Sequence, residues 1–261
     1  MDEISIAYCP ERVLPGKIMR ELVENDRIVG GVNAGSTEVV KDFYSTFVSG
    51  EILGTDSKTA EMVKLSENSY RDVNIAFANE LSLICDKVGV DVGELIRLAN
   101  HHPRVKILQP GAGVGGHCIA VDPWFLVEAD PENAKLIRTA REQNDYKKEW
   151  VVEKIKFTVD HFKKKHKKEP IVACMGLAFK PDIDDLRESP AKYIALKLIE
   201  SGLSILPVEP NLDKHPDFHT VIYKEAILQA DIIVFLVKHK EFVGLPNDSS
   251  KIILDFCGIY N

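Results

Sequence analysis

The chain has 261 residues, of which 45% are hydrophobic and 28% charged, a composition typical of a folded globular protein with room for two compact units. Its formal net charge of −7 argues against a nucleic-acid partner, and no apolar run approaches the roughly 20 residues of a membrane span. Five scattered cysteines without a CxxC motif signal neither a zinc site nor a disulfide framework, and they fit a reducing, cytoplasmic setting.

Residues 1–55 alternate strand and helix patterns. "ISIAYCP", "RIVGGV" and "GEILG" have strand character, and "STEVVKDFYSTFV" has helical spacing with Ser36 or Thr37 as its N-cap. The segment is too short for a complete parallel-sheet domain and opens almost directly on a strand. We therefore expect it to be the final portion of such a domain, a remnant whose beginning is absent.

Residues 56–150 are expected to be helical. A long amphipathic pattern ends at Gly89, a natural residue to follow a helix. The next helix opens on Asp91, with a glutamate three residues later at capping-box spacing. Two more helices are predicted to begin with an aspartate N-cap and a proline, at Asp122-Pro123 and at Asp130-Pro131.

Residues 151–261 alternate strands and helices, which predicts a doubly wound parallel sheet. The basic run at 161–170 is interpreted as the solvated end of a helix that precedes the first strand. Pro207 lies inside a predicted strand and indicates an edge strand or a bulge. The strands are "PIVACMGLAF", "LSILPVEP", "DIIVFLVK" and "KIILDFCG", and the helices are "SPAKYIALKLIESG" and "YKEAILQA".

The stretch "QPGAGVGGHC" contains a literal G-x-G-x-x-G, but its context is wrong for a dinucleotide-binding turn. Such a turn follows a strand and opens a helix on its last glycine. Here Pro110 precedes the glycines directly, and the next helix is expected only at Asp122. A plain flexible turn is the simpler alternative. Because glycines are costly to order, we favour a loop that approaches a ligand closely. Its glycines are Gly111, Gly113, Gly115 and Gly116.

Cys118 stands at the end of this loop, about one turn ahead of a predicted helix N-terminus. A helix dipole in that position favours a thiolate, so Cys118 is a candidate nucleophile. A lone cysteine is more often a small buried hydrophobe. The glycine-rich approach and Asp122 four residues later favour the nucleophile.

Four more polar residues occupy positions that suit a binding or catalytic site. Lys64 and Asn68 are four residues apart and share one helix face, although a lysine there can also extend to solvent harmlessly. Lys180 and Arg187 lie near the carboxyl end of a predicted strand, where open sheets bind ligands and where two cations suit a pyrophosphate. The alternative is a surface loop in which Arg187 pairs with Asp184 or Asp185.

Taken together, these stretches resemble the nucleotide-sugar 6-dehydrogenases, the family of UDP-glucose dehydrogenase. The resemblance covers essentially the whole chain, and the motifs stand in family order. "GGHC" and "AVDPWF" are most similar to the bacterial branch that acts on UDP-N-acetyl-D-mannosamine. The matching stretches are "AYCPERVLPG", "AEMVKLSENSYRDVNIAFANELSLIC", "GVGGHCIAVDPWF" and "GLAFKPDIDDLRESPA".

The resemblance implies an NAD-dependent, two-step oxidation of UDP-N-acetyl-D-mannosamine to its uronate. Cys118 would trap the intermediate aldehyde as a thiohemiacetal, from which a second hydride leaves, and water would cleave the resulting thioester. Lys64, assisted by Asn68, would stabilise the oxyanion. Asp122 would order Lys64 and a water or transfer a proton, and Glu11 would serve thioester hydrolysis.

The resemblance also implies binding roles. The glycine loop would line the sugar-nucleotide site, with Lys180 on the UDP side. Arg187 would reach NAD from the C-terminal domain. Arg104 would enter the active site of a neighbouring subunit in a homodimer, and the long helix of residues 56–88 carries enough apolar surface to form that dimer.

Two departures from the family pattern matter. Val121 stands where UDP-glucose enzymes often carry a lysine, which favours the N-acetylhexosamine branch. Residues 1–55 also lack the family's complete NAD-binding domain, so this chain alone is expected to be inactive or crippled. Three alternatives stay open: a non-catalytic UDP-sugar-binding and dimerisation module, a UDP-N-acetylglucosamine 6-dehydrogenase, and a cysteine acyl-transfer enzyme with His117 as base.

Overall fold

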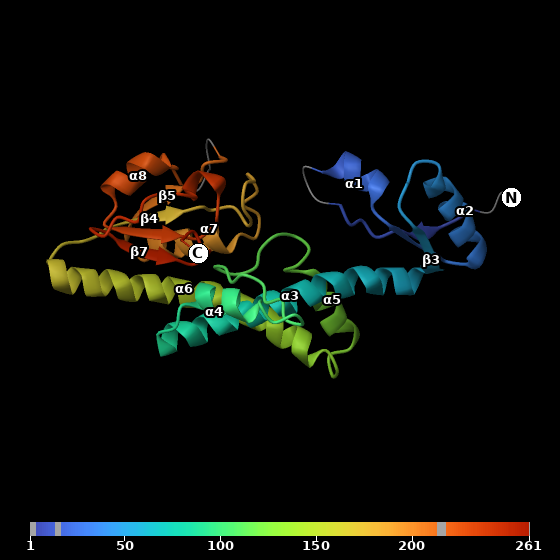
Figure 1. The fold of residues 1–261 in the computed structure, drawn as a ribbon, viewed down its shortest axis with the longest axis horizontal. Helices are drawn as coiled ribbons and strands as arrows, with labels where there is room; N and C mark the ends of the chain where they lie inside the picture. Colours follow the sequence, from blue (N-terminus) through green and yellow to red (C-terminus); the bar gives the residue numbers. More distant parts are fainter. Residues whose placement is uncertain (1–3, 14–16, 213–217, 261) are drawn as a thin grey trace. The chain divides into compact units, whose positions relative to one another are not determined.

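The computed structural model describes residues 4–13, 17–212 and 218–260, and the chain forms two compact units, Met1–Ser69 and Tyr70–Asn261 (Figure 1). Helix α3 (Ser57–Val88) begins in the first unit and ends in the second. Among the residues described, no helix combines the length and apolarity that crossing a membrane requires. The division into three domains at 55/56 and 150/151 stays a prediction.

The first unit holds a three-stranded sheet in the order β1-β2-β3, with β2 and β3 parallel and β1 antiparallel to β2. The strands expected here are confirmed, but the N-cap expected for the second helix is wrong. Asn33 caps it, and its Oδ1 accepts the N–H of Ser36 at 2.8 Å. The elements are β1 (Ala7–Tyr8), α1 (Ile18–Glu24), β2 (Arg27–Gly31), α2 (Ala34–Ser45) and β3 (Ile52–Asp56).

The second unit begins with a helical layer. The predicted end of α3 is confirmed, because Gly89 has a φ of +74° directly after the helix. Two predicted starts are wrong by a few residues. Asp122 is the first residue of α5 rather than its cap, and α6 begins four residues after Pro131, since Asp130 binds Asn133 in a separate turn. The elements are α4 (Val92–Ala99), α5 (Asp122–Ala129) and α6 (Lys135–His166).

A buried polar seam joins α3 to α6. Arg141 donates to the Asp72 carboxylate at 2.6 Å, and both side chains are at most 1% exposed. Asn144 donates to the same carboxylate at 2.8 Å, and the Asn79 amide donates to Asn144 at 2.9 Å. One turn further on, the Lys147 ammonium donates to Ser82 of α3 at 2.6 Å. Because these polar groups pair with one another, the seam fixes the register of the two helices.

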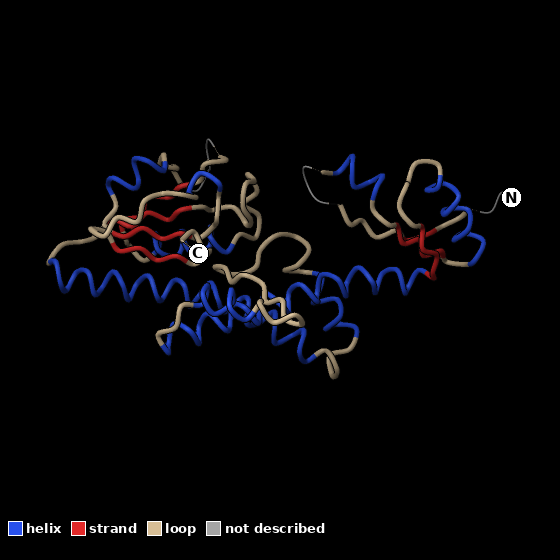
Figure 2. The backbone as a smooth tube through the Cα atoms, in the orientation of Figure 1, coloured by secondary structure: helices blue, strands red, loops and turns tan. Residues whose placement is uncertain are grey.

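A parallel four-stranded sheet follows, in the order β5-β4-β6-β7. Figure 2 shows its strands in red, with helices in blue around them. Alternate residues of its strands pack against α6 and α7 on one face and against α8 on the other, which confirms the doubly wound class. Pro207 lies in the edge strand β5, as predicted. The elements are β4 (Ile171–Met175), α7 (Pro190–Glu200), β5 (Ser204–Val208), α8 (Tyr223–Gln229), β6 (Ile232–Phe235), the short 3-10 helix η1 (Lys240–Phe242) and β7 (Ile252–Asp255).

Candidate functional site

The second unit contains a cavity of about 800 Å³ at the carboxyl ends of its parallel strands. The chain leaves β4 toward β5 on one side, while β6 and β7 lie on the other, so the strand order reverses between β4 and β6. Open parallel sheets bind ligands at such a reversal. Near the strand ends the cavity is lined by two lysines, Lys180 after β4 and Lys238 after β6, and from the α4 segment it is lined by Asp91, Glu94 and Arg97.

The glycine loop borders this cavity and packs against the segment between β4 and α7. A Cβ on Gly115 would lie 2.4 Å from the Glu188 carbonyl oxygen, and one on Gly113 would lie 2.9 Å from Pro190. Gly116 has a φ of +85° and faces the Phe179 ring. The close approach expected of these glycines is therefore to protein. Gly111 lines the cavity and has no such neighbour nearer than 3.7 Å.

The helix seam anchors the start of the loop. The N–H of Gly111 donates to Asn79 Oδ1 at 2.9 Å, and Asn79 is fully buried. The loop thus inherits its position from the same side chains that align α3 with α6. No strand precedes the glycines and no helix opens on Gly116, so the rejection of a dinucleotide-binding turn is confirmed.

Glu209, at the end of β5, ties together the two loops that carry the cavity lysines. Its buried carboxylate accepts the N–H groups of Leu177 and Ala178 at 2.7 and 2.9 Å and faces His239 Nε2 at 3.1 Å. Although burial raises the pKa of Glu209, His239 and these backbone donors bring the net pKa below its usual range. Glu209, His239 and the backbone of Leu177 and Ala178 thus form a clamp whose carboxylate is ionised.

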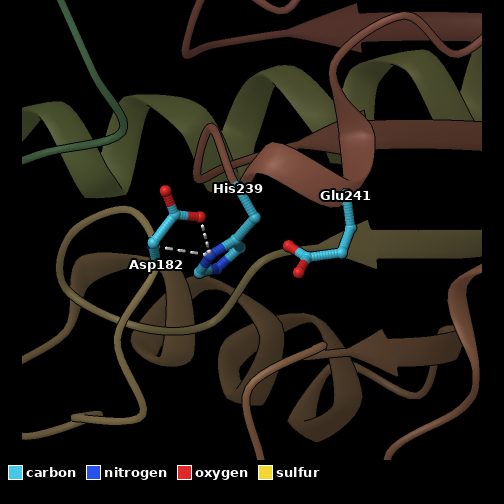
Figure 3. Close-up of side chains that lie close together, drawn as sticks. All are labelled: Asp182, His239 and Glu241. Atoms are coloured by element: carbon cyan, nitrogen blue, oxygen red, sulfur yellow. Dashed lines mark hydrogen bonds and ion pairs between the residues drawn. The ribbon is translucent and has the colours of Figure 1, made fainter.

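Asp182, His239 and Glu241 bring their ligand-type atoms within 4.8 Å of one another (Figure 3). The Asp182 N–H donates to His239 Nδ1 at 3.0 Å, so that nitrogen is an acceptor and Nε2 carries the proton toward Glu209. Both ring nitrogens are thus engaged in hydrogen bonds. This group fits a clamp between loops better than a metal site.

Cys118 is exposed and lies one turn before α5, as the sequence predicts. Its carbonyl accepts the N–H groups of Val121 and Asp122 at 3.0 and 2.8 Å, which sets the thiol just ahead of the helix N-terminus. Burial raises the pKa of the buried thiol Cys174 to about 12 and also raises the pKa values of Cys9, Cys85 and Cys257. Cys118 is thus the cysteine most open to a reagent.

A second cavity, of about 790 Å³, lies beside the residues that precede α5. It is lined by His117 and Val121 on one side and by Arg187 on the other, so it brings Arg187 near the cysteine loop. Arg187 also donates to the Asp185 carboxylate at 2.7 Å, which was the alternative expected from the sequence. That bond lowers the pKa of Asp185 to about 2.

The remaining sequence candidates are divided between the units. Asp122 is half-buried at the start of α5, and Arg104 is exposed after α4. Glu11, Lys64 and Asn68 belong to the first unit, where Asn68 is only 7% exposed. Partial burial raises the pKa of Glu11, but the Arg12 N–H and the Arg27 guanidinium bring that pKa below its usual range.

Among the described residues, the first unit has one helix start that could hold a dinucleotide. This is the start of α2, beside a cavity of about 420 Å³ at the ends of β2 and β3. There the Ser36 N–H is bound by the Asn33 side chain, the Thr37 N–H by the Asn33 carbonyl, and the Gly31 N–H by the Thr37 hydroxyl. These three N–H groups are therefore engaged within the protein and are not free to bind a pyrophosphate.

Three models of one family match the chain. The UDP-glucose/GDP-mannose dehydrogenase family matches through its NAD binding domain over residues 1–48, its central domain over 58–146 and its UDP binding domain over 173–261. The UDP binding model covers β6, β7 and the carboxyl-terminal part of β4, and residues that follow these strands line the large cavity.

Individual relatives of the chain belong to the same family. The chain is 54% identical to a UDP-N-acetyl-D-mannosamine dehydrogenase of Campylobacter jejuni over 98% of its length and 63% of the relative's. It is 52% identical to an NDP-N-acetyl-D-galactosaminuronic acid dehydrogenase of Ralstonia nicotianae, over 99% and 62%. A solved UDP-D-ManNAc dehydrogenase from Pyrococcus horikoshii is 39% identical with a TM-score of 0.87, over 98% of this chain and 62% of that one. The chain thus spans less than two thirds of these relatives.

Three residues at or beside the large cavity escaped the sequence analysis: Lys238, which lines it, and His239 and Glu209, which hold the neighbouring loops together. Lys238 and Glu209 lie at the ends of the predicted strands "DIIVFLVK" and "LSILPVEP", and His239 directly follows the first of them, so the rule that ligands bind at strand ends could have found all three. The missing information was which strands are neighbours, because only the observed order places the ends of β4, β5 and β6 together.

Proposed function

Because the chain belongs to the UDP-glucose/GDP-mannose dehydrogenase family, we propose that it binds a nucleoside diphosphate N-acetylhexosamine and takes part in its NAD-dependent oxidation at the sugar C6. The single observation that carries the proposal is the cavity at the reversal of strand order, with Lys180 lining it near the strand ends. An ammonium there suits a diphosphate, and the apolar side chains Phe179, Pro110 and Pro190 suit the nucleoside.

Cys118 is proposed as the nucleophile of the reaction. Its thiolate adds to the carbonyl carbon of the sugar aldehyde, and the carbonyl oxygen takes up a proton to give a thiohemiacetal. Loss of a hydride from the thiohemiacetal carbon and of its hydroxyl proton leaves a thioester, and water then adds to the thioester carbon and releases the thiol and the carboxylate. The exposure of Cys118 and its position before α5 support this role. NAD would supply the hydride acceptor.

The supporting roles follow the family pattern residue by residue. Lys64 and Asn68 are proposed to stabilise the oxyanion, Asp122 to act in proton transfer, and Glu11 to assist thioester hydrolysis. The lowered pKa of Glu11 supports a carboxylate that is ionised at neutral pH. Arg187 is proposed to face NAD, and Arg104 to enter the site of a second subunit.

UDP-N-acetyl-D-mannosamine is the proposed substrate, because the relative with that name shares 54% identity with this chain. A relative named for an N-acetyl-galactosamine sugar shares 52%, so the hexosamine is decided by assay. The test follows NADH formation with UDP-N-acetylmannosamine, UDP-N-acetylglucosamine and UDP-N-acetylgalactosamine. A signal that is largest with the first sugar and is abolished in Cys118→Ser supports the proposal.

A second candidate is a UDP-sugar-binding and dimerisation module without redox activity. The capped start of α2 favours it, because the Ser36 and Thr37 N–H groups there are already bound by Asn33. UDP binding without NADH formation would support this alternative. Binding is tested by calorimetry with UDP, where Lys180→Ala should weaken the affinity by roughly 1.5–3 kcal/mol, the range for a hydrogen bond to a charged group.

A homodimer through α3 is also proposed. Tyr70, Phe77 and Ile84 recur at seven-residue spacing along one face of the helix and are 71%, 55% and 51% exposed. Large apolar side chains at that spacing are typical of a helix that packs against another helix.

A further inference from the structure

The cavity has a polar asymmetry. Near the strand ends it is lined by two ammonium groups, on Lys180 and Lys238, and none of its lining residues there is a carboxylate. From the α4 segment it is lined by two carboxylates and the guanidinium of Arg97, which lies 3.8 Å from Glu94. An anion entering the cavity is therefore drawn to the strand ends and away from α4.

Lys180 and Lys238 reach the same cavity from two separate strand ends. Lys180 follows β4 and Lys238 follows β6, and these two strands are direct neighbours in the sheet. The strand order reverses between them, so the connections after β4 and β6 diverge and leave the crevice open. Two cations that approach from separate strands can contact two phosphates of one ligand, whereas a lone lysine acts as a single point charge.

The clamp described above holds both lysine loops in place. Glu209 binds the backbone of Leu177 and Ala178, just before Lys180, and also meets His239, which directly follows Lys238. Asp182 completes the tie, because its N–H donates to His239 and its carboxylate accepts the N–H of Lys240 at 3.0 Å. The two ammonium groups are thus carried by a preorganised frame.

Lys238 is half-buried, and its ammonium donates to the carbonyl of Gly258, three residues after the end of β7. An ammonium has three donors, so this bond leaves others for a ligand. Lys180 makes no hydrogen bond or ion pair with the residues that the structure describes, and its ammonium lies 5.7 Å from the Phe179 ring centroid. Both lysines can therefore donate into the cavity.

We propose that Lys238 is a second diphosphate-binding residue, which acts with Lys180 in the same cavity and sets the preference of this pocket for a nucleoside diphosphate over a monophosphate. This assignment rests on the proposed function, since it refines the ligand of the same cavity.

The test compares calorimetric titrations of UDP and UMP into the wild-type chain and into Lys238→Met. Methionine keeps much of the side chain's length and removes its charge. We expect UDP affinity to fall roughly tenfold, the lower end of what a hydrogen bond to a charged group contributes, and UMP affinity to fall less. Lys238→Arg should restore most of the UDP affinity, because a guanidinium also binds phosphate.

Lys240→Met is the matched control. Lys240 lies two residues further on, its side chain is 72% exposed and 3.8 Å from Glu241, and it does not line the cavity. It should leave both affinities unchanged. Lys238 could instead be only a tie between β6 and β7. In that case Lys238→Met would weaken UDP and UMP by the same factor, and the proposal would be overturned.

The outcomes separate the two proposals. A wild-type chain that binds no UDP would overturn the proposed function and this assignment together. A wild-type chain that binds UDP, with a Lys238→Met variant that binds it equally well, would overturn the assignment of Lys238 alone.

Discussion

Lys147 offers a prediction about stability that can be worked out from the structure. Its side chain lies in the seam between α3 and α6 and is 2% exposed. The ammonium donates to Ser82 Oγ at 2.6 Å and lies 4.5 Å from the Trp150 ring centroid. Burial lowers its pKa to about 7 from an ordinary value of 10.5, although Asp86 partly opposes the shift.

The sign of the effect follows from linkage. Below pH 7 both the folded and the unfolded chain hold the proton, so the cost of burying the ammonium is fully present. Between pH 7 and about 10.5 only the unfolded chain keeps it, and the free energy of unfolding rises by about 1.4 kcal/mol per pH unit. The whole interval corresponds to about 5 kcal/mol.

Lys147→Met should remove this dependence and stabilise the second unit most below pH 7. The loss of the lysine leaves Ser82 paired, because its hydroxyl also donates to the Asn79 carbonyl at 2.6 Å. Urea unfolding at pH 6, 7.5 and 9 measures the effect through tryptophan fluorescence, since both tryptophans, Trp124 and Trp150, lie in the second unit. Lys148→Met, which removes a surface ion pair with Asp145, is the control.

The stability advantage of Lys147→Met over wild type should shrink by about 2 kcal/mol between pH 7.5 and 9, at 1.4 kcal/mol per unit. The control should follow the wild type. Parallel curves for wild type and Lys147→Met across this range would refute the reasoning, because the buried amine would then not release its proton.

Three further predictions follow from the site and the helices. Gly115→Ala should destabilise the second unit by about 1–3 kcal/mol in thermal unfolding, because the added Cβ would lie 2.4 Å from the Glu188 carbonyl oxygen. Gly111→Ala in the same loop should destabilise it less, and equal effects of the two substitutions would contradict the packing argument. Iodoacetamide at neutral pH should label Cys118 first, because the other cysteines are partly or fully buried, and a bound UDP-sugar should slow this labelling. Peptide mapping that finds Cys9 or Cys257 labelled first would remove the physical case for Cys118 as the nucleophile. Sedimentation at micromolar concentration should show a dimer that Phe77→Asp dissociates, and a wild-type monomer would exclude the proposed α3 interface.

The sequence predicted most elements because their signals are local. Gly89, Asp91 and Ser189 mark helix ends through backbone geometry and capping that depend on a few neighbouring residues. The errors have the same origin. Asn33 and Ser36 both suit an N-cap, and only the path of the chain leaving β2 decides between them. Asp130 was expected to open a helix, but it closes a separate turn with Asn133.

Long-range features of the site were harder to predict. The glycine pattern indicated close approach, yet the neighbours are Phe179, Glu188 and Pro190, more than sixty residues further along the chain. The clamp of Glu209 and His239 joins residues 30 apart through the order of the strands. The family resemblance identified Lys180 without knowledge of the strand order, whereas Lys238 could be identified only once the order of the strands was known.

A crystal structure of the chain with UDP tests the central claim most directly. The account predicts the diphosphate in the 800 Å³ cavity at the ends of β4 and β6, within hydrogen-bond reach of Lys180, with the nucleoside against Phe179. UDP bound in the cavity beside His117 and Arg187, or at the start of α2, would contradict it.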